Sequence, residues 1–251
     1  GIAEELYQSF YLLFGGLRGG LAIATVLMAT LFGACTGIVG AGVITIGLLA
    51  LPSMLSRGYN KGLASGSICV GGGLGVIIPP SIMLIFYGAT AGVSISALFI
   101  AGIIPGVLMA SLDMAYIGVR AGLQPSTAPA ISKEERNLVT GSQLFKMICK
   151  SMVPPLFLIL AVLGTIFFGV AAPSEAGAMG ALGAVVVTAF YRKLTWNSLK
   201  EAALITLRIS TMVLFIALGG KLFTAVFLSM VAIDLVIGFL LSLPFGPTGI
   251  I

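Results

Sequence analysis

Long apolar runs alternate with short basic segments along this chain. Most of the lysines and arginines fall between residues 18 and 61, 120 and 150, or 192 and 208. Basic loops of membrane proteins stay on the cytoplasmic side. The pattern therefore places these three segments in the cytoplasm. The uncharged turns at 89–96 and 169–174 then face the opposite side of the membrane.

Five membrane crossings follow from this arrangement, each near the roughly 20 residues that span the hydrocarbon core. Residues 120–150 contain the one polar stretch and are predicted to be a cytoplasmic connector, followed by scaffold spans over 151–227. We therefore expect an all-α polytopic membrane protein. The predicted crossings are Gly62–Gly88, Ala97–Val119, Met152–Phe168, Ala176–Phe190 and Ala203–Phe227.

Residues 21–56 do not fit this scheme as a simple span. The segment is apolar between Arg18 and Arg57, which lie on the same side, and it carries the small residues Gly33–Gly37 at its centre. Two full crossings would leave almost no residues for a turn. Non-helical backbone is tolerated inside the bilayer where protein or a water-filled cavity satisfies it. We therefore favour a re-entrant helical hairpin.

The first predicted crossing is interrupted. The sequence Gly71–Ser81 (GGGLGVIIPPS) places four glycines and two prolines in the middle of a span. Proline removes an amide donor, and glycine adds backbone freedom. Helix unwinding over this segment would leave carbonyl groups that need another partner. We predict a broken helix here, which belongs with its return span to a transport region over residues 61–119.

Two neighbouring broken elements are typical of the binding site of a secondary transporter. Freed carbonyls and the hydroxyls of Thr36 and Ser81 suit a hard monovalent cation such as Na⁺. The amide ends of half-helices suit a carboxylate. The alternative is that the glycines of Gly33–Gly37 and Gly71–Ser81 only permit close helix packing, as small residues do in membranes.

The composition supports lipid as the main solvent and excludes several classes of function. Hydrophobic residues make up 59% of the chain and charged residues 8%, whereas soluble domains carry about a quarter charged residues. The chain has no histidine, so it lacks His-based catalysis and His-ligated metals. No basic stripe indicates nucleic acid. We expect no enzyme activity, and we expect Cys35, Cys69 and Cys149 to be small buried hydrophobes.

Two acidic residues lie near apolar segments. Asp113 is inside a predicted crossing, where an ionisable residue is by default a functional candidate; its place near the cytoplasmic end also permits pairing or snorkelling. Glu175 follows Pro173 at a predicted helix start, where a carboxylate is favoured by the helix dipole. We expect Glu175 to cap that helix.

The two ends of the chain resemble each other. Gly1–Leu17 and Val231–Leu243 each carry one or two acids and an amphipathic apolar run. Five crossings separate them, and an odd number inverts the second relative to the first, as in inverted-topology repeats. We expect an interfacial arm helix over 1–20 and a second arm helix over 228–251.

The motifs taken together resemble the large membrane subunit of tripartite ATP-independent periplasmic (TRAP) transporters, over nearly the whole chain. The segments that carry this resemblance are Leu17–Leu21 (LRGGL), Phe32–Gly37, Leu51–Met54 (LPSM), Gly75–Ser81 (GVIIPPS), Phe86–Gly88, Pro105-Gly106 and Ala172–Ala176 (APSEA).

The resemblance implies sodium-driven import of a small organic anion, such as a C4-dicarboxylate or a sugar acid, by an elevator-type mechanism in the bacterial inner membrane. It implies two partners, a periplasmic solute-binding protein and a small membrane subunit. It also implies that the chain stops before a second hairpin and a second unwound helix, so that this part alone does not transport.

The resemblance also assigns site residues. It implies a sodium site, held largely by backbone carbonyls, and a substrate site that overlaps it. The family usually has a small polar residue where Ile38 stands and often a hydroxyl where Gly73 stands. The implied sodium ligands are Cys35, Thr36, Gly37, Gly73, Gly75, Pro79 and Ser81, and the implied substrate contacts are Thr36, Gly37, Pro80 and Ser81.

Two other transport functions remain open at this point. One is a sodium/anion symporter with the same hairpin architecture and no binding protein. The other is a passive channel. Both would use the broken elements, and only the first requires coupling to sodium.

Overall fold

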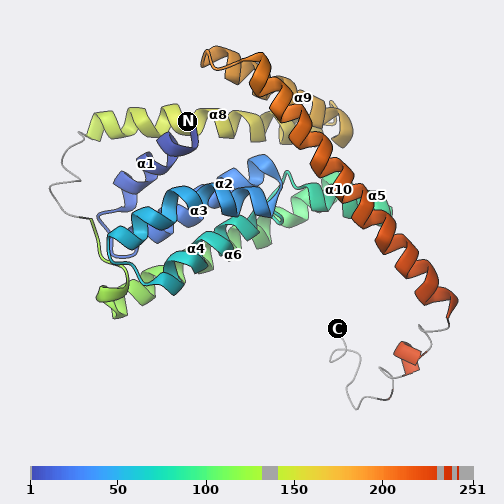
Figure 1. Cartoon of the computed structure of the whole chain (residues 1–251), viewed down its shortest axis with the longest axis horizontal. Helices are drawn as coiled ribbons and strands as arrows, with labels where there is room; N and C mark the ends of the chain where they lie inside the picture. Colours follow the sequence, from blue (N-terminus) through green and yellow to red (C-terminus); the bar gives the residue numbers. More distant parts are fainter. Residues whose placement is uncertain (1, 132–140, 231–234, 239–241, 243–251) are drawn as a thin grey trace. The chain divides into compact units, whose positions relative to one another are not determined.

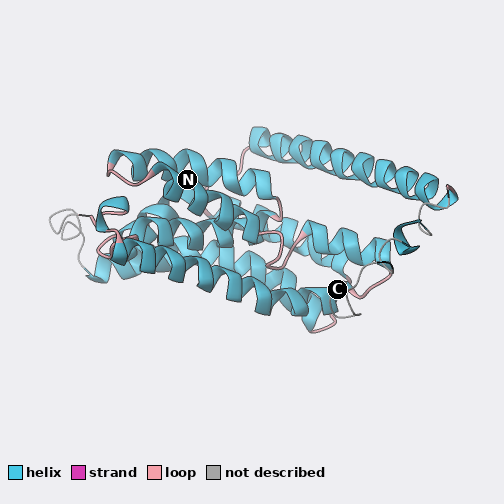
Figure 2. Cartoon of the chain, turned by 90° about the horizontal axis from the view of Figure 1, so that it is seen from below, coloured by secondary structure: helices cyan, strands magenta, loops and turns pink. Residues whose placement is uncertain are grey.

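The computed structural model describes residues 2–131, 141–230, 235–238 and 242. It consists of two compact units, residues 1–190 and 191–251. The described residues form helices and loops, with no strand among them (Figures 1 and 2). The helices are α1 (Ile2–Phe14), α2 (Gly20–Thr36), α3 (Val39–Ser56), α4 (Lys61–Leu74), α5 (Ile82–Ala91), α6 (Ile95–Leu123), the short 3₁₀ helix η1 (Pro125–Thr127), α8 (Gly141–Phe167), α9 (Pro173–Phe190) and α10 (Trp196–Ser229).

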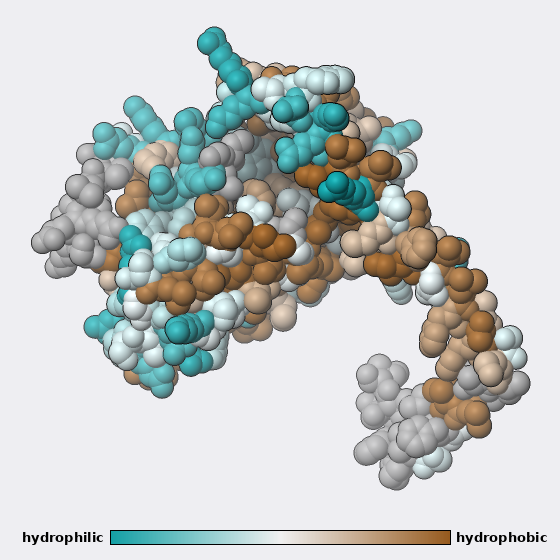
Figure 3. Space-filling model, in the orientation of Figure 1, coloured by the Kyte–Doolittle hydropathy of each residue, from teal (hydrophilic) through white to brown (hydrophobic). Residues whose placement is uncertain are grey.

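Four helices, α6, α8, α9 and α10, are long and apolar enough to cross a membrane. They coincide with four of the five predicted crossings, so the prediction of a polytopic all-α membrane protein is confirmed at this level. Many of their large apolar side chains lie on the surface, as lipid-facing residues do, and Figure 3 shows hydrophobic surface along much of the described part of α10. Helix α8 already begins at Gly141 and α10 at Trp196, both earlier than the predicted spans.

Helices α2 and α3 form the predicted helical hairpin. Gly37 ends α2 in the left-handed conformation, with φ of 64°, and its amide donates to the Gly33 carbonyl at 2.7 Å. Glycine adopts this conformation without steric cost. Ile38 is extended, and α3 begins at Val39. A two-residue link therefore reverses the chain between helices of 17 and 18 residues.

The base of the hairpin is held by neighbouring loops. The hydroxyl of Tyr59 accepts a hydrogen bond from the Leu21 amide at 3.2 Å, and only 3% of Tyr59 is exposed. Helix N-termini have amides without intrahelical partners, and the N-cap residue of α2, Gly19, has no side chain to supply one. Residues 127–131 also bond to the loops at the hairpin base. The Asn60 amide donates to the Thr127 carbonyl, and the Ile131 amide donates to the Gly15 carbonyl.

The break in the first crossing is shorter than predicted. Helix α4 continues to Leu74, and the non-helical segment covers residues 75–81 instead of 71–81. Gly71 and Gly72 stay helical because they serve close packing: a Cβ on Gly71 would lie 2.7 Å from the Ala29 Cβ, and one on Gly72 would overlap Val43. The packing alternative therefore holds for these two glycines, and unwinding begins where Gly75 precedes the prolines.

The hairpin and the break are in direct backbone contact at Gly33 and Gly75. A Cβ added to Gly75 would lie 2.5 Å from the Gly33 Cα, and one added to Gly33 would lie 2.8 Å from the Gly75 Cα. Side chains at either position would force the two backbones apart. This contact fixes the position of the break beside the last turn of α2.

Several predicted features lie outside the described residues. Of the second arm helix, expected over 228–251, the structure describes only residues 228–230, 235–238 and 242. The middle of the predicted connector, residues 132–140, is also outside the description. Within the first predicted arm, residues 2–14 form helix α1, which packs against α2 and α8.

Replacing Tyr59 by Phe should destabilise the hairpin base. The substitution removes the only side-chain acceptor that the described structure gives to the Leu21 amide, and a buried hydrogen bond of this kind is worth about 1 kcal/mol. We expect a lower midpoint of thermal unfolding for purified protein in detergent. Tyr87→Phe is the control, because Tyr87 is 56% exposed. An unchanged midpoint for Tyr59→Phe would show that this capping bond contributes nothing.

Gly75→Ala should destabilise the protein, whereas Gly73→Ala should not. The new Cβ at 75 meets only backbone atoms of Gly33, and overpacking of this kind costs about 1–3 kcal/mol. A Cβ at 73 meets nothing within 4 Å, and alanine is the better helix former by up to about 1 kcal/mol. Thermal unfolding of the two variants measures the difference. Equal midpoints would mean that the Gly33–Gly75 contact is not tight.

Candidate functional site

The tip of the hairpin lies against the end of the break. A Cβ added to Gly37 would lie 3.1 Å from the Ile82 Cγ1 and 3.2 Å from the Ile82 nitrogen. Since Gly33 already touches Gly75, the last turn of α2 runs along the whole break, from its first residue to the start of α5. The two segments that the sequence singled out are therefore neighbours in space.

Both segments line one cavity of about 340 Å³. The hairpin tip contributes Cys35, Thr36 and Gly37, and the break contributes Pro80 and Ser81. The remaining wall is apolar and comes from the start of α5, from α6, and from α8 and α9. Its residues are Ile82, Ile85, Phe99, Leu158, Ile159, Val162, Ile166, Pro173, Gly177, Gly180, Ala181 and Ala184.

The two hydroxyl groups of this cavity differ in how they are held. Thr36 Oγ1 donates to the Phe32 carbonyl at 3.0 Å, so its lone pairs remain available to a cation or a donor. Ser81 is 1% exposed, and its Oγ accepts from the Leu84 amide at 3.4 Å as the N-cap of α5. Ser81 therefore keeps its hydroxyl proton for donation.

Four helix termini meet at the tip and the break. Helices α2 and α4 end there, and α3 and α5 begin there. Helix C-termini carry a partial negative charge and N-termini a partial positive one. Among the described residues, no backbone hydrogen bond ends on the carbonyls of Gly75, Pro79 or Pro80. The region therefore offers oxygen atoms for a cation and amide groups for an anion within one small volume.

Three residues implied as sodium ligands are not part of the cavity lining. Gly73 lies within α4, and its carbonyl accepts from the amide of Val76 at 3.1 Å. Gly75 is buried against Gly33, and Pro79 is among the most buried residues. The carbonyls of Gly75 and Pro79 lie on the broken segment, whereas Thr36, Gly37, Pro80 and Ser81 line the cavity itself.

The cysteines are not buried as the sequence suggested. Cys35, Cys69 and Cys149 are all free and exposed. Cys35 makes one polar contact, from its Sγ to the Pro155 carbonyl at 3.7 Å. This contact joins the hairpin tip to α8.

The wall formed by α9 was missed at the sequence level. Gly177, Gly180, Ala181 and Ala184 line the cavity, and their spacing of three, four and seven residues puts them on one helix face. That small-residue spacing is the signal that could have found them. The predicted cap of this helix is confirmed, because Glu175 Oε2 accepts from the Ala172 amide at 3.0 Å.

Within the described residues, no group of three or more His, Cys, Asp or Glu side chains could hold a metal ion. A cation at this site would therefore be held by carbonyl and hydroxyl oxygens. Such oxygen ligands suit a hard cation.

The comparisons with known proteins agree with this architecture. The family model described as tripartite ATP-independent periplasmic transporter, DctM component, matches residues 1–251. The chain is 32% identical over 90% of its length to the C4-dicarboxylate TRAP transporter large permease protein of Pseudomonas aeruginosa, of which it covers 51%. It is 32% identical over 94% of its length to an ectoine/5-hydroxyectoine TRAP transporter large permease of Ruegeria pomeroyi, of which it covers 54%.

A third relative is a fused protein, the isethionate TRAP transporter permease DctMQ of Oleidesulfovibrio alaskensis, with 31% identity over 89% of this chain and 34% of that protein. The chain spans about half the length of the large permeases that it matches. These relatives are transporter permease subunits and not enzymes. The family model, the relatives and the hairpin beside a broken helix lead to one conclusion: the chain belongs to the DctM family of tripartite ATP-independent periplasmic transporters.

Proposed function

We propose that this chain forms the substrate-translocating part of a sodium-coupled importer of a small organic anion in the bacterial inner membrane. The observation that carries the proposal is the shared cavity of the hairpin tip and the broken helix. Discontinuous helices that meet at one point are the usual sites of ion and solute in secondary transporters.

The hairpin in this proposal is re-entrant. The break follows the 14 residues of α4 and precedes the 10 residues of α5. It therefore lies near the middle of the predicted crossing Gly62–Gly88. The hairpin tip touches the break at Ile82. If α4 and α5 together cross the bilayer, the tip stops near its midplane, where its backbone faces the cavity and not lipid.

Sodium would bind at the C-terminal ends of α2 and α4. The dipoles of both helices favour a cation there, and the carbonyls of Gly37, Gly75 and Pro79 together with Thr36 Oγ1 would be its oxygen ligands. The hydrogen bond from the Thr36 hydroxyl to Phe32 turns its proton away from such an ion. An anionic substrate would bind at the opposite helix ends.

The substrate would meet the N-terminus of α5 and the Ser81 hydroxyl. The first amides of a helix favour an anion, and Ser81 can donate one hydrogen bond to a carboxylate. The apolar wall from α8 and α9 would contact the carbon skeleton. A carboxylate such as a C4-dicarboxylate or a sugar acid fits this combination, and the name of the Pseudomonas aeruginosa relative is consistent with it.

A complete transporter in this proposal contains three further components. The relatives are about twice as long as this chain, so a second hairpin and a second broken helix would come from the remaining half. A small membrane subunit and a periplasmic solute-binding protein would complete the assembly. The fused DctMQ relative supports a membrane partner.

Thr36→Ala should weaken the sodium dependence of uptake. We expect the sodium concentration for half-maximal uptake by the full-length complex in proteoliposomes to rise about tenfold, since loss of a ligand worth about 1.4 kcal/mol has this effect. Thr90→Ala is the matched control, because the Thr90 hydroxyl also bonds back to its own helix, at Phe86, but lies on an exposed face. Equal sodium dependence in both variants would remove Thr36 from the ion site.

Ser81→Ala should raise the KM for the carboxylate substrate. The change removes a donor from the cavity and the N-cap of α5, which by itself costs about 1 kcal/mol of stability. Ser94→Ala is the matched control: Ser94 caps α6 with the same 3.4 Å bond, to Ala97, but is exposed. Uptake kinetics in proteoliposomes at saturating sodium compare the two variants, because loss of a cap affects both and loss of the substrate donor affects only Ser81→Ala. A KM that rises equally in both variants would assign Ser81 a capping role alone.

The assembly can be tested by affinity purification of the tagged full-length permease from its native host. We expect a small membrane protein to co-purify, and a periplasmic protein to associate when substrate is added. Sodium-dependent uptake by the full-length permease alone would contradict the need for a binding protein and favour a simple symporter. Currents without sodium dependence would favour a channel.

A further inference from the structure

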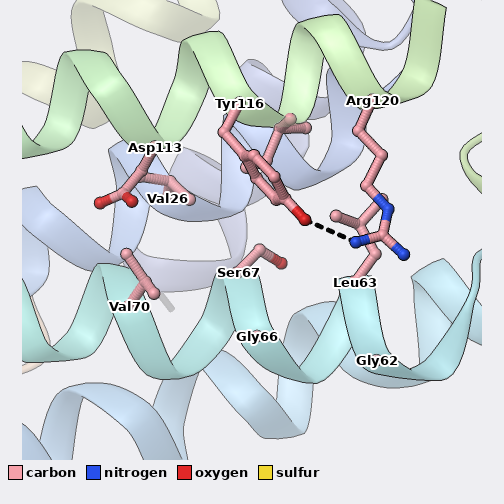
Figure 4. Close-up of a pocket in the computed structure, with 10 residues that line it drawn as sticks. Val26, Gly62, Leu63, Gly66, Ser67, Val70, Asp113, Tyr116 and Arg120 are labelled. Atoms are coloured by element: carbon pink, nitrogen blue, oxygen red, sulfur yellow. Dashed lines mark hydrogen bonds between the residues drawn. The ribbon is translucent and has the colours of Figure 1, made fainter. Parts of the chain in front are cut away.

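A second cavity, of about 410 Å³, lies between α2, α4 and α6 (Figure 4). It shares no lining residue with the cavity at the hairpin tip. Its walls are mainly apolar, with Val26 from α2, Leu63 and Val70 from α4, and Ile117 from α6. Ser67 adds one hydroxyl, and the charged residues of the lining are Asp113 and Arg120.

Asp113 has an oxygen without a partner. Its Oδ2 has less than 1 Å² of accessible surface and no hydrogen bond within the described part of the chain. Asp113 as a whole is half-buried, and the burial of this one oxygen disfavours the ionised form of the carboxyl group unless a positive charge compensates it. The sequence permitted an ion pair between Asp113 and a basic residue, but none of the residues that the structure describes near Asp113 forms one.

Arg120 would be the obvious partner, but its guanidinium is engaged elsewhere. Arg120 lies about two helical turns from Asp113 on α6, and its Nη1 donates to the Tyr116 hydroxyl at 2.5 Å. Figure 4 shows Tyr116 between the two charged residues, with the guanidinium on the side away from Asp113. The lining residues contributed by α2 and α4 carry no charge.

A metal cation fits this cavity poorly. Hard cations require several oxygen ligands at short distance, and the side-chain oxygens of the lining belong to Asp113, Ser67 and Tyr116. Ser67 Oγ is bonded to the Ala64 carbonyl at 2.9 Å, and the Tyr116 oxygen already faces a guanidinium. A proton needs only one oxygen, and it removes the uncompensated charge completely.

We propose that Asp113 is an exchangeable proton-binding site, reached through the cavity between α2, α4 and α6. Protonation converts the isolated carboxylate into a neutral acid that the apolar walls tolerate. The same cavity is lined by Arg120, which lies at the end of the span that the sequence places in the cytoplasm, so the cavity offers a route for proton exchange with that side. This site is separate from the proposed substrate cavity and stands whether or not that cavity binds sodium.

The test is labelling by dicyclohexylcarbodiimide, an apolar reagent that adds to protonated carboxyl groups. The acid proton moves to a carbodiimide nitrogen, and the carboxyl oxygen bonds to the central carbon. Rearrangement to the acylurea retains every atom, so the peptide gains the mass of the whole reagent. The full-length permease with its partner subunits, in native membranes, is labelled over a range of pH and mapped by mass spectrometry.

We expect the rate of Asp113 modification to fall as the pH rises, by about tenfold per pH unit above the carboxyl pKa. We expect the same rate in 100 mM NaCl as in 100 mM choline chloride. In Asp113→Asn the label at this position should disappear. Glu175 is the internal control, because its carboxylate is exposed and bonded to the Ala172 amide, and it should react at least tenfold more slowly. Arg120→Gln should leave the labelling of Asp113 within about twofold.

Three results would overturn the proposal. Protection by Na⁺ at constant pH would make Asp113 a sodium ligand. If Arg120→Gln raised the labelling of Asp113 more than tenfold, Arg120 would be the ion-pair partner of Asp113. Labelling of Glu175 but not of Asp113 would show that the carboxyl group holds no accessible proton. Because the wild-type complex supplies the pH and sodium results, the test does not depend on the folding of Asp113→Asn.

Discussion

The contact between Gly33 and Gly75 is the constraint on which the rest of the site depends. At this point the backbones of α2 and the broken helix approach more closely than any pair of side chains would permit. Non-helical backbone inside a membrane needs protein or water to satisfy its polar groups. The last turn of α2 covers one side of residues 75–82 with protein, and the cavity lies on their other side. A side chain at either glycine would open a gap along the break.

This contact also determines the electrostatics of the centre. Because α2 ends beside the break, two helix C-termini and two N-termini converge within a few residues of Gly37 and Ser81. Partial charges of both signs are thereby placed around one cavity without any ionised side chain. The arrangement avoids the cost of burying full charges, and it is consistent with the absence of Asp, Glu, Lys and Arg from the described lining of this cavity.

Helix α2 connects the two cavities of this unit. Its Val26 forms part of the wall of the Asp113 cavity, and its final turn carries Cys35, Thr36 and Gly37 into the other. The hairpin base is held by a hydrogen bond that the Leu21 amide donates to Tyr59, and by backbone hydrogen bonds with the loop after η1. A shift of α2 along its axis would therefore alter both cavities together.

The sequence alone determined the class of fold, the main crossings and the two broken segments, because these depend on local properties: runs of apolar residues, clusters of basic residues, and glycine and proline at fixed places. The residue pattern indicated Thr36 and Ser81, and the resemblance to TRAP permeases added Gly37 and Pro80; the structure brings all four to one cavity. Only the tertiary structure decided where unwinding begins. Gly71 and Gly72 look as flexible as Gly75 in the sequence, but they remain helical because α2 and α3 pack against them. Pro154-Pro155 similarly lies inside the continuous helix α8, whereas Pro79-Pro80 lies in the break. The tertiary structure also decided three further features: the α9 wall of the cavity, the exposure of the cysteines, and the separation of Asp113 from Arg120. Each depends on which helix surfaces meet, and local sequence does not encode this directly.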